Sequence, residues 1–335
     1  MTQKNKQLQN GNKFISPSVP SGSKGEMEHS ASVSNTGAAN DKLDNISNFF
    51  EKQLQKWELA RTNFAGLKTV KTKSFSFGDF EIRVQFNPAR IVSSGAKVDA
   101  KTIAERPCFL CSTNLPPEQI SIKAGNYSVL VNPFPIFPEH FTIPYKNHVP
   151  QQIKPYFSDL LDLAKSMDKY VVFYNGPKCG ASAPDHLHFQ AGTKNFLPLI
   201  DDYKRLRDTH VKLIEVNGES WLYSFGNYLR TVFCIESNEK NALVVHFNAL
   251  YDQLKAENAE EPLMNIVASY ENDKWYVFIL PRKAFRPWQY TATDDRQLLV
   301  SPATVEMCGV FITPIESHFD KITKEDIQNI LEQVG

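Results

Sequence analysis

Two histidines and a glutamine stand at every second position in the segment His186-Leu187-His188-Phe189-Gln190. On a β-strand, this alternation places His186, His188 and Gln190 on one face, and the two apolar residues on the other. A neutral imidazole is a nucleophile near neutral pH, and an amide can donate a hydrogen bond to developing negative charge. A single histidine on a strand is more often structural. From the pattern alone, both a structural pair and a reactive site remain open.

The second chemical signal is a pair of cysteines, Cys108 and Cys111, separated by two residues. Two thiolates at this spacing can bind one tetrahedral metal ion, which then needs two further ligands from elsewhere in the chain. A redox pair is expected at the start of a helix in a thioredoxin-like pattern, whereas a proline-containing loop follows here. Two buried structural cysteines are the remaining alternative. Three further cysteines have no spacing that groups them and are expected to be small apolar residues: Cys179, Cys234 and Cys308.

Composition limits the class of protein. The chain has 335 residues, of which 41% are hydrophobic, and no apolar run approaches the roughly 20 residues of a membrane span. Its 37 basic and 37 acidic residues balance, which argues against bulk binding of nucleic acid. The first residues lack the apolar region of a secretory signal peptide, and five cysteines do not form a disulfide framework. We therefore expect a cytoplasmic protein that binds neither nucleic acid nor a membrane.

The elements expected to position these residues begin after a polar segment. Residues 1–40 are rich in Ser, Asn, Gly, Lys and Gln, and are expected to be a disordered tail. Apolar residues at helical spacing predict a helix within 41–67. The patterns that follow predict a hairpin (69–85), a strand-turn-strand (127–144), a helix (151–168) and a strand (171–174), which a Gly- and Pro-containing loop joins to the histidine segment.

The second half of the chain carries a similar mixture of elements. A connecting region of helical character is expected at 195–213, strands between 221 and 245, and a helix at 248–256. The segment 263–282 is a clear hairpin that turns at Glu271-Asn272-Asp273, and a helix at 324–334 follows the segment 301–313. The sequence thus predicts an α+β fold.

The stretch Val171–Gly192 resembles the signature of the histidine-triad superfamily. Its Asn175-Gly176, its Gly180-Ala181-Ser182 and its His-x-His-x-Gln resemble the nucleotidyltransferase branch, whereas the hydrolases have a third histidine in place of the glutamine. That branch includes galactose-1-phosphate uridylyltransferase, the diadenosine tetraphosphate phosphorylases and the GDP-hexose phosphorylases. The resemblance implies a histidine-triad-like antiparallel sheet with packed helices in two related halves. Residues 41–198 would be the catalytic half and 199–335 a degenerate copy, in a monomer with an internal pseudo-dimer or in a homodimer.

The resemblance also implies a reaction. His188 would attack the α-phosphorus of a nucleoside diphosphate sugar or dinucleoside polyphosphate, and the nucleotidyl-histidine would pass its group to orthophosphate or a sugar phosphate. Gln190 would donate its amide N–H to a phosphoryl oxygen. The substrate-binding candidates are Asn175, Lys178, Gly180, Ala181, Ser182 and Arg90. Arg282 is a further candidate because it forms a basic cluster with Lys283 and Arg286 after a strand, for which a solvated turn is the alternative. The alternatives are a catalytically silent nucleotide- or zinc-binding module and a nucleotide hydrolase, and Gln190 argues against the hydrolase.

The resemblance finally suggests a metal ion. In the uridylyltransferases, zinc is held by Cys-x-x-Cys, by a histidine after the strand-turn-strand and by the first histidine of the triad. Carried over, this gives a structural zinc bound by Cys108, Cys111, His148 and His186, with His140 as a competitor of His148. The GDP-hexose phosphorylases lack these cysteines, so a relative with the same chemistry can lack the metal.

Overall fold

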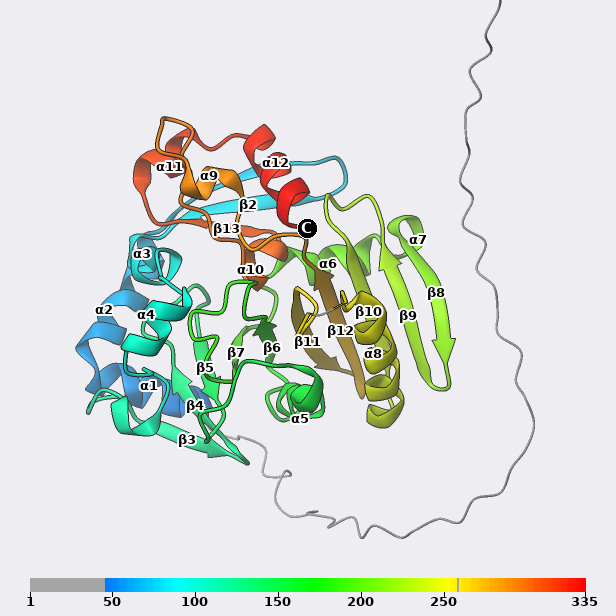
Figure 1. Cartoon of the computed structure of the whole chain (residues 1–335), viewed down its shortest axis with the longest axis horizontal. Helices are drawn as coiled ribbons and strands as arrows, with labels where there is room; N and C mark the ends of the chain where they lie inside the picture. The colour runs from blue at the N-terminus through cyan, green and yellow to red at the C-terminus, as the bar shows by residue number, and fades with distance from the viewer. Residues whose placement is uncertain (1–45, 258) are drawn as a thin grey trace, which may run out of the picture. The chain divides into compact units, whose positions relative to one another are not determined.

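The structure is a computed structural model that describes residues 46–257 and 259–335, so the expected tail of residues 1–40 lies outside the described residues (Figure 1). The helix expected within 41–67 is in fact two helices, α1 (Ile46–Lys56) and α2 (Glu58–Gly66). They are separated at Trp57, whose backbone is extended with φ −122° and ψ 102°. None of the helices in residues 46–257 and 259–335 is long and apolar enough to cross a membrane.

A ten-stranded antiparallel sheet forms the centre of the fold. Its strand order is β3-β4-β5-β7-β6-β11-β12-β10-β9-β8. The first five strands are β3 (Ser121–Ala124), β4 (Tyr127–Val131), β5 (His140–Pro144), β6 (Tyr170–Asn175) and β7 (His188–Thr193). The other five are β8 (Val211–Asn217), β9 (Ser220–Phe225), β10 (Val232–Ser237), β11 (Met264–Glu271) and β12 (Lys274–Pro281).

The two halves of this sheet repeat one topology. Each half has three strands, one helix and two further strands along the chain, and the helices are α5 (Phe157–Ser166) and α8 (Lys240–Leu254). The strand order of one half is the mirror image of the other about the β6–β11 pair, in which Asn175 lies opposite Asn265. The fold is therefore an α+β fold with an antiparallel sheet in two related halves, as the resemblance implied.

The halves differ where the chemistry is expected. In the first half, the loop 176–187 separates β6 from β7, whereas in the second half β11 and β12 are joined directly through Asn272 and Asp273. These two residues have φ values of 50° and 59°, as a tight hairpin turn requires. The second half consequently has no counterpart of the loop that precedes His188.

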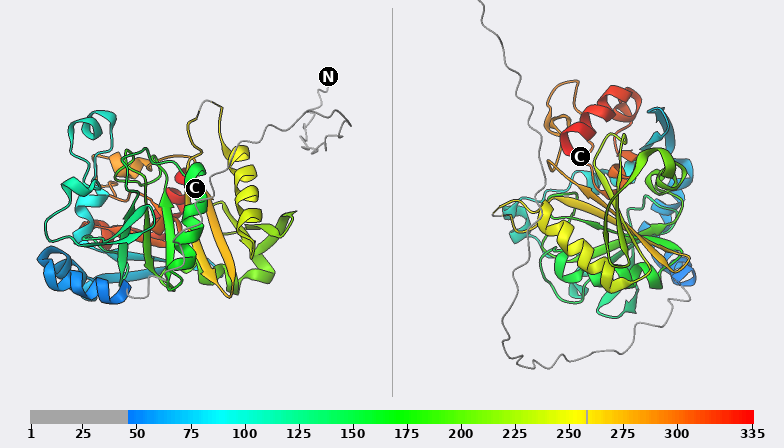
Figure 2. Two further views of the ribbon diagram at one scale, coloured as in Figure 1. Left: turned by 90° about the horizontal axis from the view of Figure 1, so that it is seen from below. Right: turned by 90° about the vertical axis from the view of Figure 1, so that its right-hand side faces the viewer.

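Both faces of the sheet are covered (Figure 2). Alternate residues of β6 enter two different cores: Val172 and Tyr174 pack in the core beneath α5 and α8, and Phe173 packs in the other. The first core includes the stacked rings of Phe157 and Phe247, whose centroids are 3.6 Å apart. The second core contains α6 (Pro198–Arg205), α12 (Lys324–Val334) and a small sheet of β1 (Lys71–Ser76), β2 (Glu81–Phe86) and β13 (Val310–Thr313).

The remaining helices are short. They are α3 (Ile91–Ser94), α4 (Ala100–Glu105), α7 (Arg207–His210), α9 (Trp288–Thr291), α10 (Thr304–Met307) and α11 (Glu316–Lys321). Two predicted boundaries were wrong. α8 begins at Lys240 rather than Asn248, because Leu243 packs in the core together with Phe247 at helical spacing. β7 begins at His188, so His186 lies in the turn before the strand.

Candidate active site and metal centre

A cavity of about 570 Å³ lies at the start of β7 and contains most of the catalytic and substrate-binding residues that the sequence singled out. Its walls come from β5, β7, the loop 176–187, the segment 90–97 and residues 301–306 of the second half. Six predicted site residues line this cavity: Arg90, Asn175, Gly180, Ser182, His188 and Gln190. Segments distant in the sequence therefore meet around His188.

His188 is held in one tautomer. Its side chain is buried, and its Nδ1 lies 2.8 Å from the carbonyl oxygen of His186, which can only accept a hydrogen bond. Nδ1 therefore carries the proton, and the lone pair is on Nε2. Burial lowers the pKa of His188 to about 4, so the imidazole is neutral near neutral pH. Gln151 fixes the backbone here, because it accepts from His188 N and donates to the carbonyls of His188 and Asn175.

Gln190 is oriented by a residue with a different predicted role. His140 Nδ1 accepts a hydrogen bond from the backbone N–H of Ile136, so its Nε2 carries the proton and donates to Gln190 Oε1 at 3.0 Å. With its oxygen occupied in this way, Gln190 presents its NH₂ group as the free donor. Burial lowers the pKa of His140 to about 3. His140, weighed from the sequence as a metal ligand, therefore belongs with Gln190 instead of with the cysteines.

Asn175 is fixed by two residues of the second half. Its Oδ1 accepts hydrogen bonds from Asn265 Nδ2, from the backbone N–H of Thr304 and from Thr304 Oγ1. The amide NH₂ of Asn175 is thus left for the cavity. Sequence reasoning missed Asn265 and Thr304, since no local pattern marks a partner that comes from the other half of the chain.

Gly180 is required by both its backbone and its surroundings. Its φ is +99°, and a Cβ atom at this position would lie 2.3 Å from the Cβ of Ala303. Glycine therefore allows the loop to approach the segment that carries Thr304.

We expect Gly180→Ala to unfold more readily than the wild type, by about 3 kcal/mol or more, because backbone strain and a steric clash add together. The matched control is Gly125→Ala, where φ is +59° and no atom lies within 4 Å of the added Cβ. This control is expected to cost about 1–2 kcal/mol. Urea denaturation measures both free energies of unfolding, and equal losses would contradict the close approach.

Three predicted binding residues do not line the cavity. Lys178 is exposed in the loop, and the backbone N–H of Ala181 donates to the carbonyl of Gly176. Arg282 is buried, and its guanidinium donates to Asn265 Oδ1 and to four backbone carbonyl oxygens: those of Val334, Pro302, Ala284 and Phe285. Arg282 therefore has a structural role and joins the C-terminal segments to Asn265 through hydrogen bonds.

A buried cation and a buried carboxyl group also line the cavity. Arg90 Nη1 donates to the carbonyl of Phe134 at 2.7 Å, while its Nε has no partner among the described residues. Burial lowers the pKa of Arg90 to about 10, against the opposing effect of Glu306. Burial also raises the pKa of Glu306 to about 7, although a backbone N–H of Ala303 and the charge of Arg90 counteract it. No motif in the sequence marks Glu306 as a site residue.

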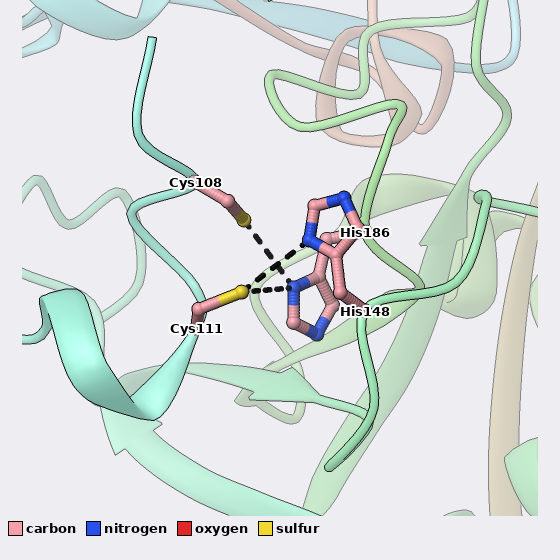
Figure 3. Close-up of side chains that lie close together, drawn as sticks. All are labelled: Cys108, Cys111, His148 and His186. Atoms are coloured by element: carbon pink, nitrogen blue, oxygen red, sulfur yellow. Dashed lines mark hydrogen bonds between the residues drawn. The ribbon is translucent and has the colours of Figure 1, made fainter.

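The second site is a cluster of two sulfur and two nitrogen donors (Figure 3). Ligand atoms of Cys108, Cys111, His148 and His186 all lie within 4.8 Å of one another. Cys108 Sγ is 3.3 Å from His186 Nδ1, and Cys111 Sγ is 3.3 Å from His148 Nδ1. Ligands bound at roughly 2.0–2.3 Å in a tetrahedron are separated by about 3.5 Å, so the cluster fits zinc.

The protonation of the cluster also suits a metal. His186 Nε2 lies 2.8 Å from the carbonyl of Tyr145, which fixes its proton on Nε2 and leaves Nδ1 as the ligand atom. Burial opposes ionisation of Cys108, but its contact with His186 and hydrogen bonds from the backbone of Leu110 and Cys111 lower its pKa to about 6. The four donors can therefore hold a metal ion and connect the loop around Cys108 to His186 in the loop before β7.

If these residues bind zinc, elemental analysis of the purified protein should find about one zinc per chain. Cys111→Ser should lower the zinc content and lower Tm by about 5 °C or more, because metal binding contributes to folding. Cys308→Ala is the control, since Cys308 is buried in the other core and should leave the zinc content unchanged. Full occupancy in the double variant Cys108→Ser, Cys111→Ser would contradict the assignment.

Comparison with known proteins finds matches for both halves of the chain. Residues 49–193 match the family model "Domain of unknown function (DUF4922)", and residues 206–335 match the model "GDPGP1-like, C-terminal domain". The chain is 28% identical over 142 residues to galactose-1-phosphate uridylyltransferase of Staphylococcus saprophyticus, a match that covers 37% of this chain and 28% of that protein. The chain thus spans well under half of this curated relative.

Solved structures extend the likeness over most of the fold. The yeast Ap4A phosphorylase Apa2 superimposes with a TM-score of 0.58 at 20% identity, covering 86% of this chain and 97% of that one. Its complex with Ap4A gives a TM-score of 0.57 at 18% identity with the same coverage. Identities this low show a shared fold.

Proposed function

We propose that this chain, which is related to the nucleotidyltransferase and phosphorylase branch of the histidine-triad-like superfamily, transfers a nucleotidyl group through a covalent bond to His188. The observation that supports this most directly is the neutral imidazole of His188, with its lone pair on Nε2, in the same cavity as the NH₂ group of Gln190. A silent binding module would not need a nucleophile held in one tautomer.

In the proposed first step, Nε2 of His188 forms a bond to the α-phosphorus while the bond to the bridging oxygen breaks. The leaving group departs with that electron pair, and a nucleotidyl-histidine remains. The NH₂ groups of Gln190 and Asn175 would stabilise charge on the non-bridging oxygens. Arg90 would neutralise the same phosphate, for which a guanidinium is suited. In the second step, an oxygen of the acceptor replaces His188.

The proposed substrate is a nucleoside diphosphate sugar or a dinucleoside polyphosphate, and the proposed acceptor is orthophosphate or a sugar phosphate. We assign the reaction to the half 41–198, and we treat 199–335 as a degenerate half that completes the cavity through Thr304 and Glu306. Such a chain would be a monomer with an internal pseudo-dimer or would form a homodimer.

We assign a structural zinc to the Cys/His cluster. When bound, the metal would crosslink the segment 108–111 to His148 and His186. Because His186 would be one of the ligands, its backbone carbonyl, which orients the ring of His188, would also be held in place.

The test is a panel of nucleoside diphosphate sugars and dinucleoside polyphosphates, incubated with and without phosphate, with product release followed by chromatography. Phosphate-dependent release of a nucleoside diphosphate would support a phosphorylase. Substrate labelled at the α-phosphate should also leave a label on the denatured protein. Binding without any adduct or turnover would instead identify a silent nucleotide-binding module.

A further inference from the structure

Arg106 is a second guanidinium in the same cavity. It precedes the cysteine pair, and its side chain is only 21% exposed. Its Nη2 donates to the carbonyl oxygen of Ser182 at 3.2 Å and to Asp185 Oδ1 at 3.0 Å. Both partners belong to the loop before β7, so Arg106 is anchored to the segment that leads to His188.

The other nitrogen of this guanidinium is unused. Nη1 of Arg106 is shielded from water and has no hydrogen-bond partner among residues 46–257 and 259–335. The same holds for Nε of Arg90. A buried N–H without an acceptor is costly, and the cost is higher for a charged group. Two such atoms, on two cations that line one cavity, indicate that the cavity is built to receive an anion.

The two cations lie next to different groups of the site. Arg90 is close enough to His140 to affect its charge, and His140 in turn contacts Gln190. Arg106 instead contacts Asp185, in the loop that leads to His188. A single phosphate held at Gln190 and Arg90 would leave Arg106 for a neighbouring group.

We propose that Arg106 binds the phosphate adjacent to the one that His188 attacks, so that the site selects nucleotides with at least two consecutive phosphates. When the bond between the attacked phosphorus and the bridging oxygen breaks, the electron pair stays on the departing phosphate. Arg106 neutralises that charge. This inference rests on the proposed function, in which the ligand is a nucleotide and His188 attacks its phosphorus.

Asp185 is the positioning residue for this contact. One carboxylate oxygen binds Arg106, and the other lies 3.6 Å from Nε2 of His148, a member of the Cys/His cluster. The cluster and the phosphate-binding guanidinium are therefore connected through one side chain. Loss of the Asp185 charge should loosen Arg106 without removing it.

The experiment measures Kd by calorimetry on the full chain for three pairs of ligands: ADP and AMP, GDP and GMP, and UDP and UMP. In Arg106→Gln, the affinity for the best-bound diphosphate should fall about 10-fold or more, and that for its monophosphate by less than about 2-fold. Arg106→Lys should restore part of the preference, because it keeps the charge but loses the fork. Asp185→Asn should give a smaller loss of the preference than Arg106→Gln.

The matched control is Arg296→Gln, which removes an exposed arginine that pairs with Asp294 and should change neither affinity. Circular dichroism establishes that each variant is folded. If Arg106→Gln does not fold, the ratio of diphosphate to monophosphate affinity is measured in Arg106→Lys, where it is expected to fall about 3-fold. Equal losses for diphosphate and monophosphate, or an unchanged ratio, overturn the role of Arg106 alone. If no nucleotide binds the wild type, the proposed function fails as well.

Discussion

Replacement of His188 with alanine is expected to reduce nucleotidyl transfer by at least about 10⁴-fold and to abolish the covalent adduct. His188 is the nucleophile in the proposed reaction, and its Nε2 lone pair is the one that the tautomer leaves available in the cavity. The measurement is transfer from a substrate labelled at the α-phosphate, together with the label retained on the denatured protein.

This variant should also lose stability, because His188 is only 3% exposed. The structure shows a buried ring that donates to the carbonyl of His186. Leaving that carbonyl without a donor costs about 1–3 kcal/mol. His188→Asn is the control, since its amide can still donate to His186. Transfer at the wild-type rate in the asparagine variant would mean that another residue does the chemistry.

The pKa of His188 also determines how the rate of adduct formation depends on pH. A histidine with its usual pKa of about 6.5 loses its nucleophilic form below that pH, whereas His188, with a pKa of about 4, stays neutral to lower pH. Protonation of His188 should therefore not slow adduct formation until the pH is well below 6. A transition near pH 7 would come from Glu306 instead, whose pKa is about 7, and Glu306→Gln should remove it.

Stability depends on pH through the same residue and through His140, whose pKa is about 3. Both folded-state values lie below the value of about 6.5 in the unfolded chain. The unfolded chain therefore binds these protons first, and the stability that these two residues contribute is lost as the pH falls from about 6.5 towards their folded-state values.

Local patterns predicted the parts of the site that are close in sequence or are carried by a resemblance. The hairpin at 263–282 and the helix at 324–334 follow from period and turn residues, and the structure confirms both. The four metal-ligand candidates, inferred from the resemblance, are brought together by the fold.

The rest of the site depends on pairing between the halves. Asn175 is held by Asn265 across the β6–β11 pair and by Thr304, which is 129 residues away in the chain. No periodicity encodes such a partner. Arg282 shows the converse case: its basic cluster suggested a phosphate ligand, but burial commits its guanidinium to backbone carbonyls. The repeat of the two halves is visible in the strand order of the structure but not in the amino-acid sequence.

Gln190→His is expected to convert part of the transfer into hydrolysis. A transferase must keep its nucleotidyl-histidine until the acceptor arrives, so water has to be a poor competitor. The amide of Gln190 can donate to a phosphoryl oxygen, but it cannot exchange a proton with an attacking water. Its oxygen is also occupied by His140, at 3.0 Å from Nε2. An imidazole at position 190 that keeps its proton on one ring nitrogen, and does not accept the hydrogen bond of His140, would present its second, unprotonated nitrogen to the cavity.

That second nitrogen would act as a general base towards water, because the pKa of an imidazole lies near the working pH. General base catalysis is worth about 10²–10⁴-fold, so the ratio of hydrolysed to transferred product should rise by at least about 10-fold in Gln190→His. Gln190→Asn is the control, since it keeps an amide and should slow transfer without raising that ratio. The wild-type adduct should persist in buffer and discharge when phosphate or a sugar phosphate is added. A wild-type enzyme that hydrolyses its nucleotide equally fast without any acceptor would be a hydrolase, because Gln190 would then not protect the intermediate from water.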